Sequence, residues 1–143
     1  MADSVIAVDP GRAKCGVAVV DRDKGVQAKA VVATGQLAGT VAAYAASFSI
    51  FTVVIGDRTA SRSAQAILAQ LTVAGRPLTV WPVDEHRTSE QARRRYWQAN
   101  PPRGWKALLP VTMLTPPGPV DDYVAVILAE RYFAGRPAKY RSA

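Results

Sequence analysis

Carboxylates occupy four comparable positions along this chain of 143 residues, three of them directly after apolar segments of strand character and one at the start of an apolar helical segment. They are Asp9, Asp57, the pair Asp84-Glu85 and the pair Asp121-Asp122. Carboxylates brought together raise one another's pKa and repel, so a shared location needs cations. Hard oxygen ligands, in a chain with one histidine, suit Mg²⁺ or Mn²⁺. Two such ions, about 4 Å apart, would clamp the attacking and leaving oxygens of a phosphodiester displacement.

Each carboxylate also has a purely structural interpretation. Asp9 can accept a backbone hydrogen bond in the turn that follows it, and Asp57 and Asp84 can cap the segments after them. Asp121 and Asp122 fall in the first turn of a helix, where negative charge is favoured by the helix dipole. One such residue is more often structural than catalytic. Four such positions, each after a predicted strand or at the start of a predicted helix in a basic protein, favour a shared functional site.

The elements that would position these residues follow from the apolar periodicity. Strands are predicted at Val5–Val8, Gly16–Val20, Val26–Ala33, Phe51–Ile55 and Leu78–Val83, and helices at Leu37–Phe48, Ser61–Val73, from Thr88 onward and at Val120–Phe133. Three antiparallel strands followed by strand–helix alternation predict a single α/β domain over 1–143, with a mixed five-stranded sheet flanked by helices. If the first, fourth and fifth strands are parallel neighbours, their carboxyl ends share one rim and the last helix packs across it.

Single residues within these segments add detail to the predicted fold. Pro82 cannot donate to a strand ladder, so the fifth strand should lie at a sheet edge. Thr88 and Gln91 match a capping box at the third helix. Trp81 and Tyr96 are predicted to lie in the core. The segment Asn100–Pro119 holds six prolines and two glycines and is expected to form a long functional loop.

The formal net charge is +7 and the pI is near 10, which makes polyanions the natural partner. Positive charge gathers around the third helix and the following loop, at Arg87, Arg93, Arg94, Arg95, Arg103 and Lys106. Trp97 and Trp105 lie in the same segment and could stack on unpaired bases. The alternative to a nucleic-acid-binding surface is a basic face that is merely exposed to solvent. We prefer this interpretation for the C-terminal residues Arg136, Lys139 and Arg141.

The remaining bulk properties predict a cytoplasmic protein with no membrane association. The N-terminus has no basic region of a signal peptide, and no apolar run approaches the length of a membrane span. Cys15 is the single cysteine, and we expect it to be a small core residue in a reducing compartment. It is a poor candidate for a nucleophile because nothing near it in the sequence would activate it.

Four segments, taken in order, resemble the RNase H-like YqgF family, which is close to the RuvC resolvases. They are VDPGRAKCGVAVVD, VVIGD, VDEHRTSEQA and PVDDYVAVILAERYF. The resemblance spans nearly the whole chain and implies an RNase H-like fold and a nuclease that acts on RNA, notably in maturing the end of pre-16S ribosomal RNA. It also implies that Asp9, Glu85 and Asp121 are the catalytic, metal-binding trio, and that Lys14 lies near the site and contacts phosphate.

The sequence departs from the YqgF pattern at two places. Asp57 stands where YqgF chains carry Gly-x-Pro, close to the position of a catalytic acid in RuvC resolvases, so Asp57 is a further candidate ligand, as is Asp122. His86 replaces the usual arginine, and we favour an ordinary exposed role for it over proton transfer. Two alternatives therefore stay open. The first is a RuvC-like resolvase of branched DNA, which requires a homodimer, whereas the RNA nuclease could act as a monomer. The second is a non-catalytic module that binds nucleic acid or a ribosomal precursor.

Overall fold

A computed structural model describes residues 2–58, 61–110, 114, 116 and 118–135 of the chain. Its centre is a five-stranded sheet with the order β3-β2-β1-β4-β7. The strands are β1 (Ser4–Asp9), β2 (Lys14–Asp21), β3 (Gly25–Ala33), β4 (Thr52–Gly56) and β7 (Thr79–Val83). The pairs β1–β2 and β2–β3 are antiparallel, whereas β1–β4 and β4–β7 are parallel. The predicted mixed sheet is confirmed.

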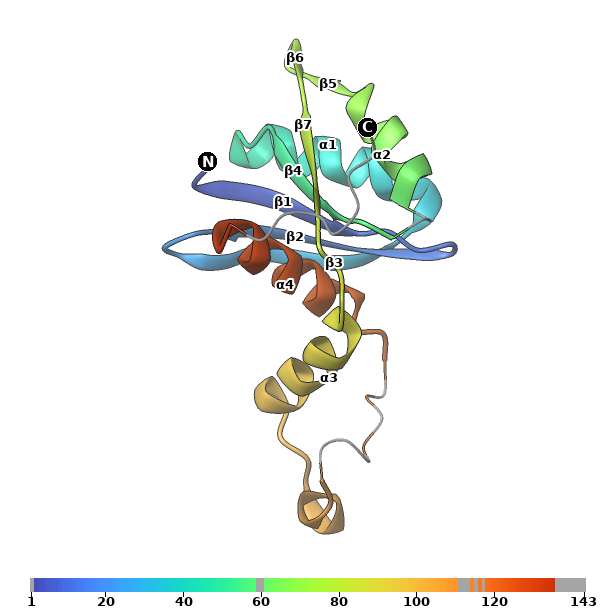
Figure 1. Cartoon of the computed structure of the whole chain (residues 1–143), viewed down its shortest axis with the longest axis vertical. Coiled ribbons are helices and arrows are strands. Elements are labelled where there is room, and N and C mark those ends of the chain that lie inside the picture. The colour runs from blue at the N-terminus through green and yellow to red at the C-terminus, as the bar shows by residue number, and fades with distance from the viewer. Residues whose placement is uncertain (1, 59–60, 111–113, 115, 117, 136–143) are drawn as a thin grey trace.

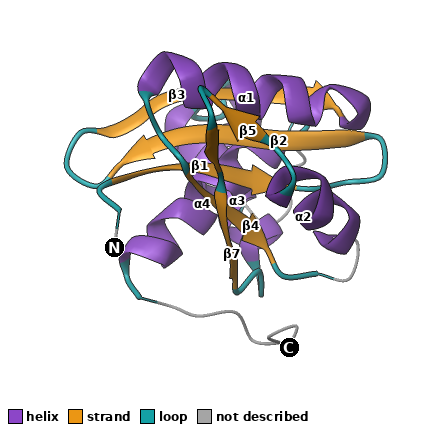
Figure 2. Cartoon of the chain, turned by 90° about the horizontal axis from the view of Figure 1, so that it is seen from above, coloured by secondary structure: helices purple, strands orange, loops and turns teal. Residues whose placement is uncertain are grey.

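Helices cover both faces of this sheet (Figures 1 and 2). On one face lie α1 (Leu37–Phe48) and α2 (Ser61–Ala69), and on the other lies α4 (Asp121–Phe133). Alternate residues of β1 therefore enter different cores: Ile6 and Val8 face α1 and α2, and Val5 and Ala7 face α4. A strand covered on both faces needs a continuous apolar sequence, which is why β1 and β4 read as unbroken runs of Val, Ile and Ala.

The third helix, α3 (Thr88–Ala99), packs against α4 and extends away from the sheet together with the segment that follows it (Figure 1). That segment contains a short 3₁₀ helix, η2 (Gly104–Leu108), within the predicted Asn100–Pro119 loop. A second 3₁₀ helix, η1 (Thr34–Gln36), leads from β3 into α1. The basic C-terminal residues after 135 lie outside the described residues.

The second helix is shorter than predicted. It ends at Ala69, and the expected last turn is instead a small hairpin of β5 (Thr72–Val73) and β6 (Arg76–Pro77). Ala74 and Gly75 connect the two strands with φ angles of 52° and 77°. Two consecutive residues of positive φ form the tight turn that suits a hairpin, so Gly75 is a turn residue rather than the end of the helix.

The capping-box prediction for α3 is wrong. Arg87 occupies the N-cap position in a left-handed conformation, with φ of 58°, and no side chain caps the helix. The Thr88 hydroxyl donates instead to the backbone carbonyl oxygen of Glu85, at 2.8 Å. Thr88 therefore fastens the turn between β7 and α3, the turn that carries Glu85.

The predictions for the edge strand had mixed outcomes. β7 is an edge strand, as Pro82 indicated, but Trp81 is 51% exposed rather than buried, because β7 has a neighbour on one side only. Tyr96 is half-buried, with its ring against that of Tyr123. Cys15 is fully buried, as expected of a core residue. Within the described residues, no helix has the length and apolar character needed to cross a membrane.

Candidate active site

The carboxyl ends of the three parallel strands meet at one rim of the sheet. Asp9 ends β1, and the last residue of β4, Gly56, lies beside Val83 at the end of β7. On the other side of β1, Asp9 pairs with Gly16 of β2. The chain therefore carries Asp9 to the middle of the rim, and the segments that leave β4 and β7 start next to it.

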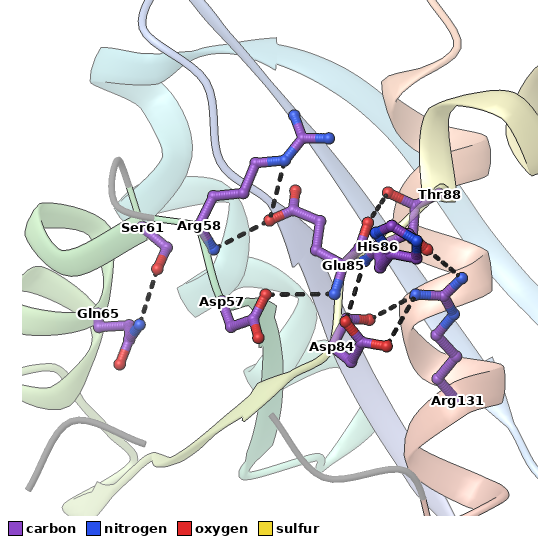
Figure 3. Close-up of polar contacts among 9 residues, drawn as sticks. All are labelled: Asp57, Arg58, Ser61, Gln65, Asp84, Glu85, His86, Thr88 and Arg131. Atoms are coloured by element: carbon purple, nitrogen blue, oxygen red, sulfur yellow. Dashed lines mark hydrogen bonds and ion pairs between the residues drawn. The ribbon is translucent and has the colours of Figure 1, made fainter. Parts of the chain in front are cut away.

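Glu85 is held on this rim by the segment that follows β4 (Figure 3). Its side chain is 3% exposed, and its Oε2 accepts a hydrogen bond of 3.1 Å from the backbone N–H of Arg58, whose Nε lies 3.7 Å away. Asp57 accepts a hydrogen bond of 3.2 Å from the backbone N–H of Glu85. A Cβ on Gly56 would lie 2.5 Å from Oε2 of Glu85, so only glycine leaves room for this carboxylate to cross the end of β4.

Asp121 reaches the rim because α4 begins directly over β2. A Cβ on Gly16 would overlap the backbone carbonyl group of Asp121, so the absence of a side chain at position 16 permits this close approach. Since Gly16 is the pairing partner of Asp9, the first residue of α4 is placed beside the end of β1. Two glycines thus make space for two of the three predicted carboxylates.

The electrostatics of Asp9 reflect the proximity of the other two carboxylates. Burial raises the pKa of Asp9 to about 8, with further contributions from a hydrogen bond to Glu85 and from the charges of Glu85 and Asp121. Arg58 offsets this only in part. Burial and the charge of Asp122 also raise the pKa of Asp121, while the hydrogen bond with Asp9 and the charge of Lys14 lower it.

The composition of this trio fits a hard divalent cation. All three groups offer oxygen, and their mutual repulsion is what a bound cation would relieve. Among the residues that the structure describes, no three His, Cys, Asp or Glu side chains already have the spacing of a formed metal site. The donor chemistry rather than a preformed cage supports Mg²⁺ or Mn²⁺, and Asp9 must give up its proton to bind.

In the metal-free protein we expect the unfolding free energy to fall as the pH rises from about 4 to about 8. Unfolded Asp9 titrates near 3.8, whereas the folded pKa is about 8. Between these values the folded state keeps a proton that the unfolded state has released, which costs at most about 1.4 kcal/mol per pH unit. Urea unfolding in EDTA at pH 5 and pH 8 would measure this slope, and Asp9→Asn should flatten it. An equal slope in the variant would contradict the assignment.

Other predicted ligands have different partners. Asp57 binds the backbone of Glu85, as described above, so its observed contact positions the trio. Asp122 forms an ion pair of 3.0 Å with Lys29 of β3. His86 is exposed, and its backbone N–H donates to Asp84 at 3.1 Å. Lys14 is exposed at the start of β2, near Asp121, as the prediction of a phosphate contact requires.

Arg131 is a positioning residue whose role the sequence analysis missed. Its side chain is 5% exposed, and its guanidinium donates to the backbone carbonyl oxygens of Asp84 at 2.7 Å and His86 at 2.6 Å, and to Oε1 of Gln91 at 3.3 Å. It thereby fastens α4, which begins with Asp121, to the turn that carries Glu85 (Figure 3). The available signal was an arginine on the apolar face of a helix.

The residues of the basic segment differ in their exposure and in their partners. Arg87, Arg93, Arg94, Arg103 and Lys106 are exposed, and Trp105 in η2 is 69% exposed. Arg94 also forms an ion pair of 3.8 Å with Glu90 one turn earlier in α3. Arg95 instead donates two hydrogen bonds to Glu130 of α4, at 2.7 and 2.5 Å. Trp97 is half-buried against Tyr96, and its Nε1 is buried without a hydrogen-bond partner within the described part of the chain. Arg95 and Trp97, which are half-buried, are thus less available to a ligand than the exposed residues.

Replacing Gly16 with alanine should destabilise the protein by about 1–3 kcal/mol, as overpacking does elsewhere, because the start of α4 must move away from β2. Displacing Asp121 should also weaken divalent-metal binding. Gly39→Ala in α1 is the matched control, since an added Cβ there meets nothing within 4 Å. Urea unfolding and Mn²⁺ titration of both variants would test this, and equal behaviour of the two would refute the close-approach argument.

Comparison with known proteins identifies the fold class. The structure of Thermus thermophilus RuvC superposes with a TM-score of 0.57 over 93% of this chain and 97% of that chain, at 17% sequence identity. The chain therefore has a RuvC-like RNase H fold. No protein-family model matches the sequence. No curated protein matches it either.

Proposed function

We propose that this protein is a divalent-metal-dependent nuclease that hydrolyses phosphodiester bonds in nucleic acid. The observation that carries the proposal is the convergence of Asp9, Glu85 and Asp121 on one rim of the sheet, where burial of Asp9 raises its pKa to about 8 and the neighbouring carboxylates add to the rise. A carboxyl group buried next to other carboxylates is costly as a structural feature and useful in a cation site.

The chain's own residues have distinct roles in this proposal. Glu85 is held in place by hydrogen bonds with the backbone N–H of Arg58 and with Asp57, which fix its position as a ligand. Asp9 and Asp121 complete the donor set from β1 and α4. Mg²⁺ or Mn²⁺, when bound, would activate water and stabilise the charge that develops on the phosphate. Lys14, beside Asp121, would contact a phosphate of the substrate strand.

Two observations support different substrates. The motif resemblance to the YqgF family favours RNA, in the manner of pre-16S ribosomal RNA processing. The fold comparison with RuvC favours branched DNA as the second candidate. Symmetric cleavage of a junction would also need a homodimer. We place RNA first because four segments in sequence order carry that resemblance.

Cleavage assays on three matched substrates would test the proposal. Single-stranded RNA, single-stranded DNA and a four-way DNA junction would each be incubated with Mg²⁺, Mn²⁺ or EDTA. We expect cleavage in either metal and none in EDTA, with RNA cut fastest. Preferential and symmetric cutting of the junction would establish the resolvase instead. Binding of all three without cleavage in any metal would leave a non-catalytic nucleic-acid-binding module and refute the nuclease.

The exposed arginines of α3 should contribute to binding through phosphate contacts. Arg93→Gln should lower the slope of log affinity against log salt concentration by about 0.7 for a single-stranded ligand, since one fewer counterion is released. Arg95→Gln is the matched control, because its guanidinium is occupied by Glu130. Fluorescence anisotropy at several salt concentrations would measure both slopes. An equal loss in the two variants would argue against a binding surface specific to the exposed residues.

A further inference from the structure

A cavity of about 1200 Å³ adjoins the carboxylate rim on the side of the sheet that α1 and α2 cover. Its walls come from the turn between β1 and β2 with the start of β2, the 3₁₀ helix η1 with the first turn of α1, helix α2, and the segments that follow β4 and β7. Glu85 and its neighbours Asp57 and Asp84 form the wall nearest the rim. The cavity therefore opens directly beside the proposed metal site, and a molecule within it would lie next to the reacting phosphate.

The wall of this cavity that is contributed by the helices is mostly apolar. It is formed by Leu37 and Ala38 of α1 and by Ala64 and Ile67 of α2, with Ser63 as a polar residue among them. Ile67 is 52% exposed, which leaves a large aliphatic side chain in contact with water. Exposed apolar surface in a concave site is typical of a place where a ligand is bound.

Charged side chains line other parts of the cavity, next to the apolar wall. The guanidinium-bearing residues Arg12, Arg58 and Arg87 line the cavity, and guanidinium planes stack well on nucleobases. The carboxylates of Asp57, Asp84 and Glu85 also line it, so a phosphate would be repelled from the inner part. A ligand that suits both features is flat and uncharged and can contact apolar side chains and guanidinium groups.

From this combination we infer that the cavity binds an unpaired nucleobase of the substrate strand, next to the phosphodiester bond that is cut. Its volume of about 1200 Å³ exceeds what a metal ion and a phosphate need, and it is larger than a typical pocket for a small organic ligand, roughly 300–1,000 Å³. A base that is paired and stacked in a duplex cannot enter such a cavity, so the nucleotide must be single-stranded or turned out of the helix. The inference rests on the proposed nuclease function and specifies its substrate as locally unpaired at the cleavage site.

Two glycines near the cavity allow a matched test. Gly35 of η1 lines the cavity, whereas Gly39 of α1 does not, and an added Cβ meets nothing within 4 Å at either position. Gly35→Phe should fill part of the cavity without disturbing the fold, and Gly39→Phe adds the same ring outside it. Thermal unfolding of both variants would check that the fold is kept. Ile67→Asn, at an exposed position, provides a second variant that removes part of the apolar wall.

The probes are a 12-nucleotide oligothymidine and an oligomer of the same length and charge that has no bases. Their affinities would be measured in EDTA, so that cleavage plays no part. We expect wild type and Gly39→Phe to prefer the oligomer with bases by about tenfold, because base burial and stacking favour it. Gly35→Phe and Ile67→Asn should lose most of that preference.

An unchanged preference in both Gly35→Phe and Ile67→Asn would overturn the inference. The binding measurement tests the base-binding cavity independently of the cleavage assay that tests the nuclease proposal. If the preference depends on Gly35 but no metal supports cleavage, the base-binding cavity stands and the catalytic proposal fails. If metal-dependent cleavage occurs but neither probe is distinguished, the nuclease stands and the cavity has no base-binding role.

Discussion

Replacing Asp9 with asparagine should reduce metal-dependent cleavage by more than about 100-fold, beyond the loss that changes to residues around metal ligands typically cause. Asp9 ends β1 at the centre of the rim, in contact with both Glu85 and Asp121. An amide of the same size keeps the packing but removes the charge that would attract the cation. Nucleic-acid affinity in EDTA should change little, because the exposed basic residues lie elsewhere.

The control for this variant is Asp23→Asn. Asp23 is an exposed carboxylate in the turn between β2 and β3, and its replacement removes the same formal charge far along the strands from the rim. Initial rates of cleavage for the two variants and wild type, at saturating Mn²⁺, would measure the effect. Cleavage by Asp9→Asn at the rate of Asp23→Asn would place the catalytic groups outside the trio.

Replacing Arg131 with methionine should lower the unfolding free energy by about 3–5 kcal/mol, as the loss of one partner from a buried charged network does. The guanidinium is buried, and its removal leaves the carbonyl oxygens of Asp84 and His86 without their donor. Methionine fills the space of the aliphatic stem. Because the turn after β7 carries Glu85, the cleavage rate should fall as well, with a larger effect on kcat than on KM.

Arg95→Met is the matched control for this prediction. Arg95 also connects α3 to α4, through Glu130, but its side chain is 40% exposed and solvent screens the pair. An exposed ion pair contributes at most about 1 kcal/mol. Urea unfolding would compare the two variants. If Arg131→Met were no more destabilising than Arg95→Met, the claim that Arg131 holds the turn in place would be wrong.

The apolar pattern predicted the central strands well because β1, β2 and β4 are buried on both faces. Val5–Val8 and the segment after Phe51 have no polar residue that would allow exposure, apart from Thr52 at the start of β4. The identity of the edge strand followed from Pro82, since a residue without an N–H tolerates only an edge or a bulge. The buried strands and the edge strand were predictable because they depend on the apolar character and hydrogen-bonding capacity of individual residues.

The errors arose where tertiary contacts override local preference. Trp81 is large and apolar, yet the edge position of β7 leaves it exposed. Thr88 looked like a helix cap, but its hydroxyl binds the turn that holds Glu85. The segment after Ala69 has apolar residues at helical spacing, and the positive φ angles of Ala74 and Gly75 turned it into a hairpin.

The site itself was only partly predictable. Strand ends and the start of a helix gave four candidate positions, because parallel strands bring such positions to one rim. The choice of Asp9, Glu85 and Asp121 among them came from the resemblance to the YqgF family. The spacing of the carboxylates depends on close approaches at Gly16 and Gly56, which no periodicity indicates. Asp122 and Arg95 were not recognised as ion-pair residues, because their partners Lys29 and Glu130 are far away in the sequence.

Direct measurement of cation binding would test the central claim most simply. Mn²⁺ would be titrated by calorimetry into metal-free wild type and Asp9→Asn at pH 8, without nucleic acid. The account predicts binding to wild type, accompanied by proton release since Asp9 must ionise, and binding at least about tenfold weaker in the variant. Equal affinity in the two proteins, or no binding to wild type, would contradict a metal centre built on Asp9, Glu85 and Asp121.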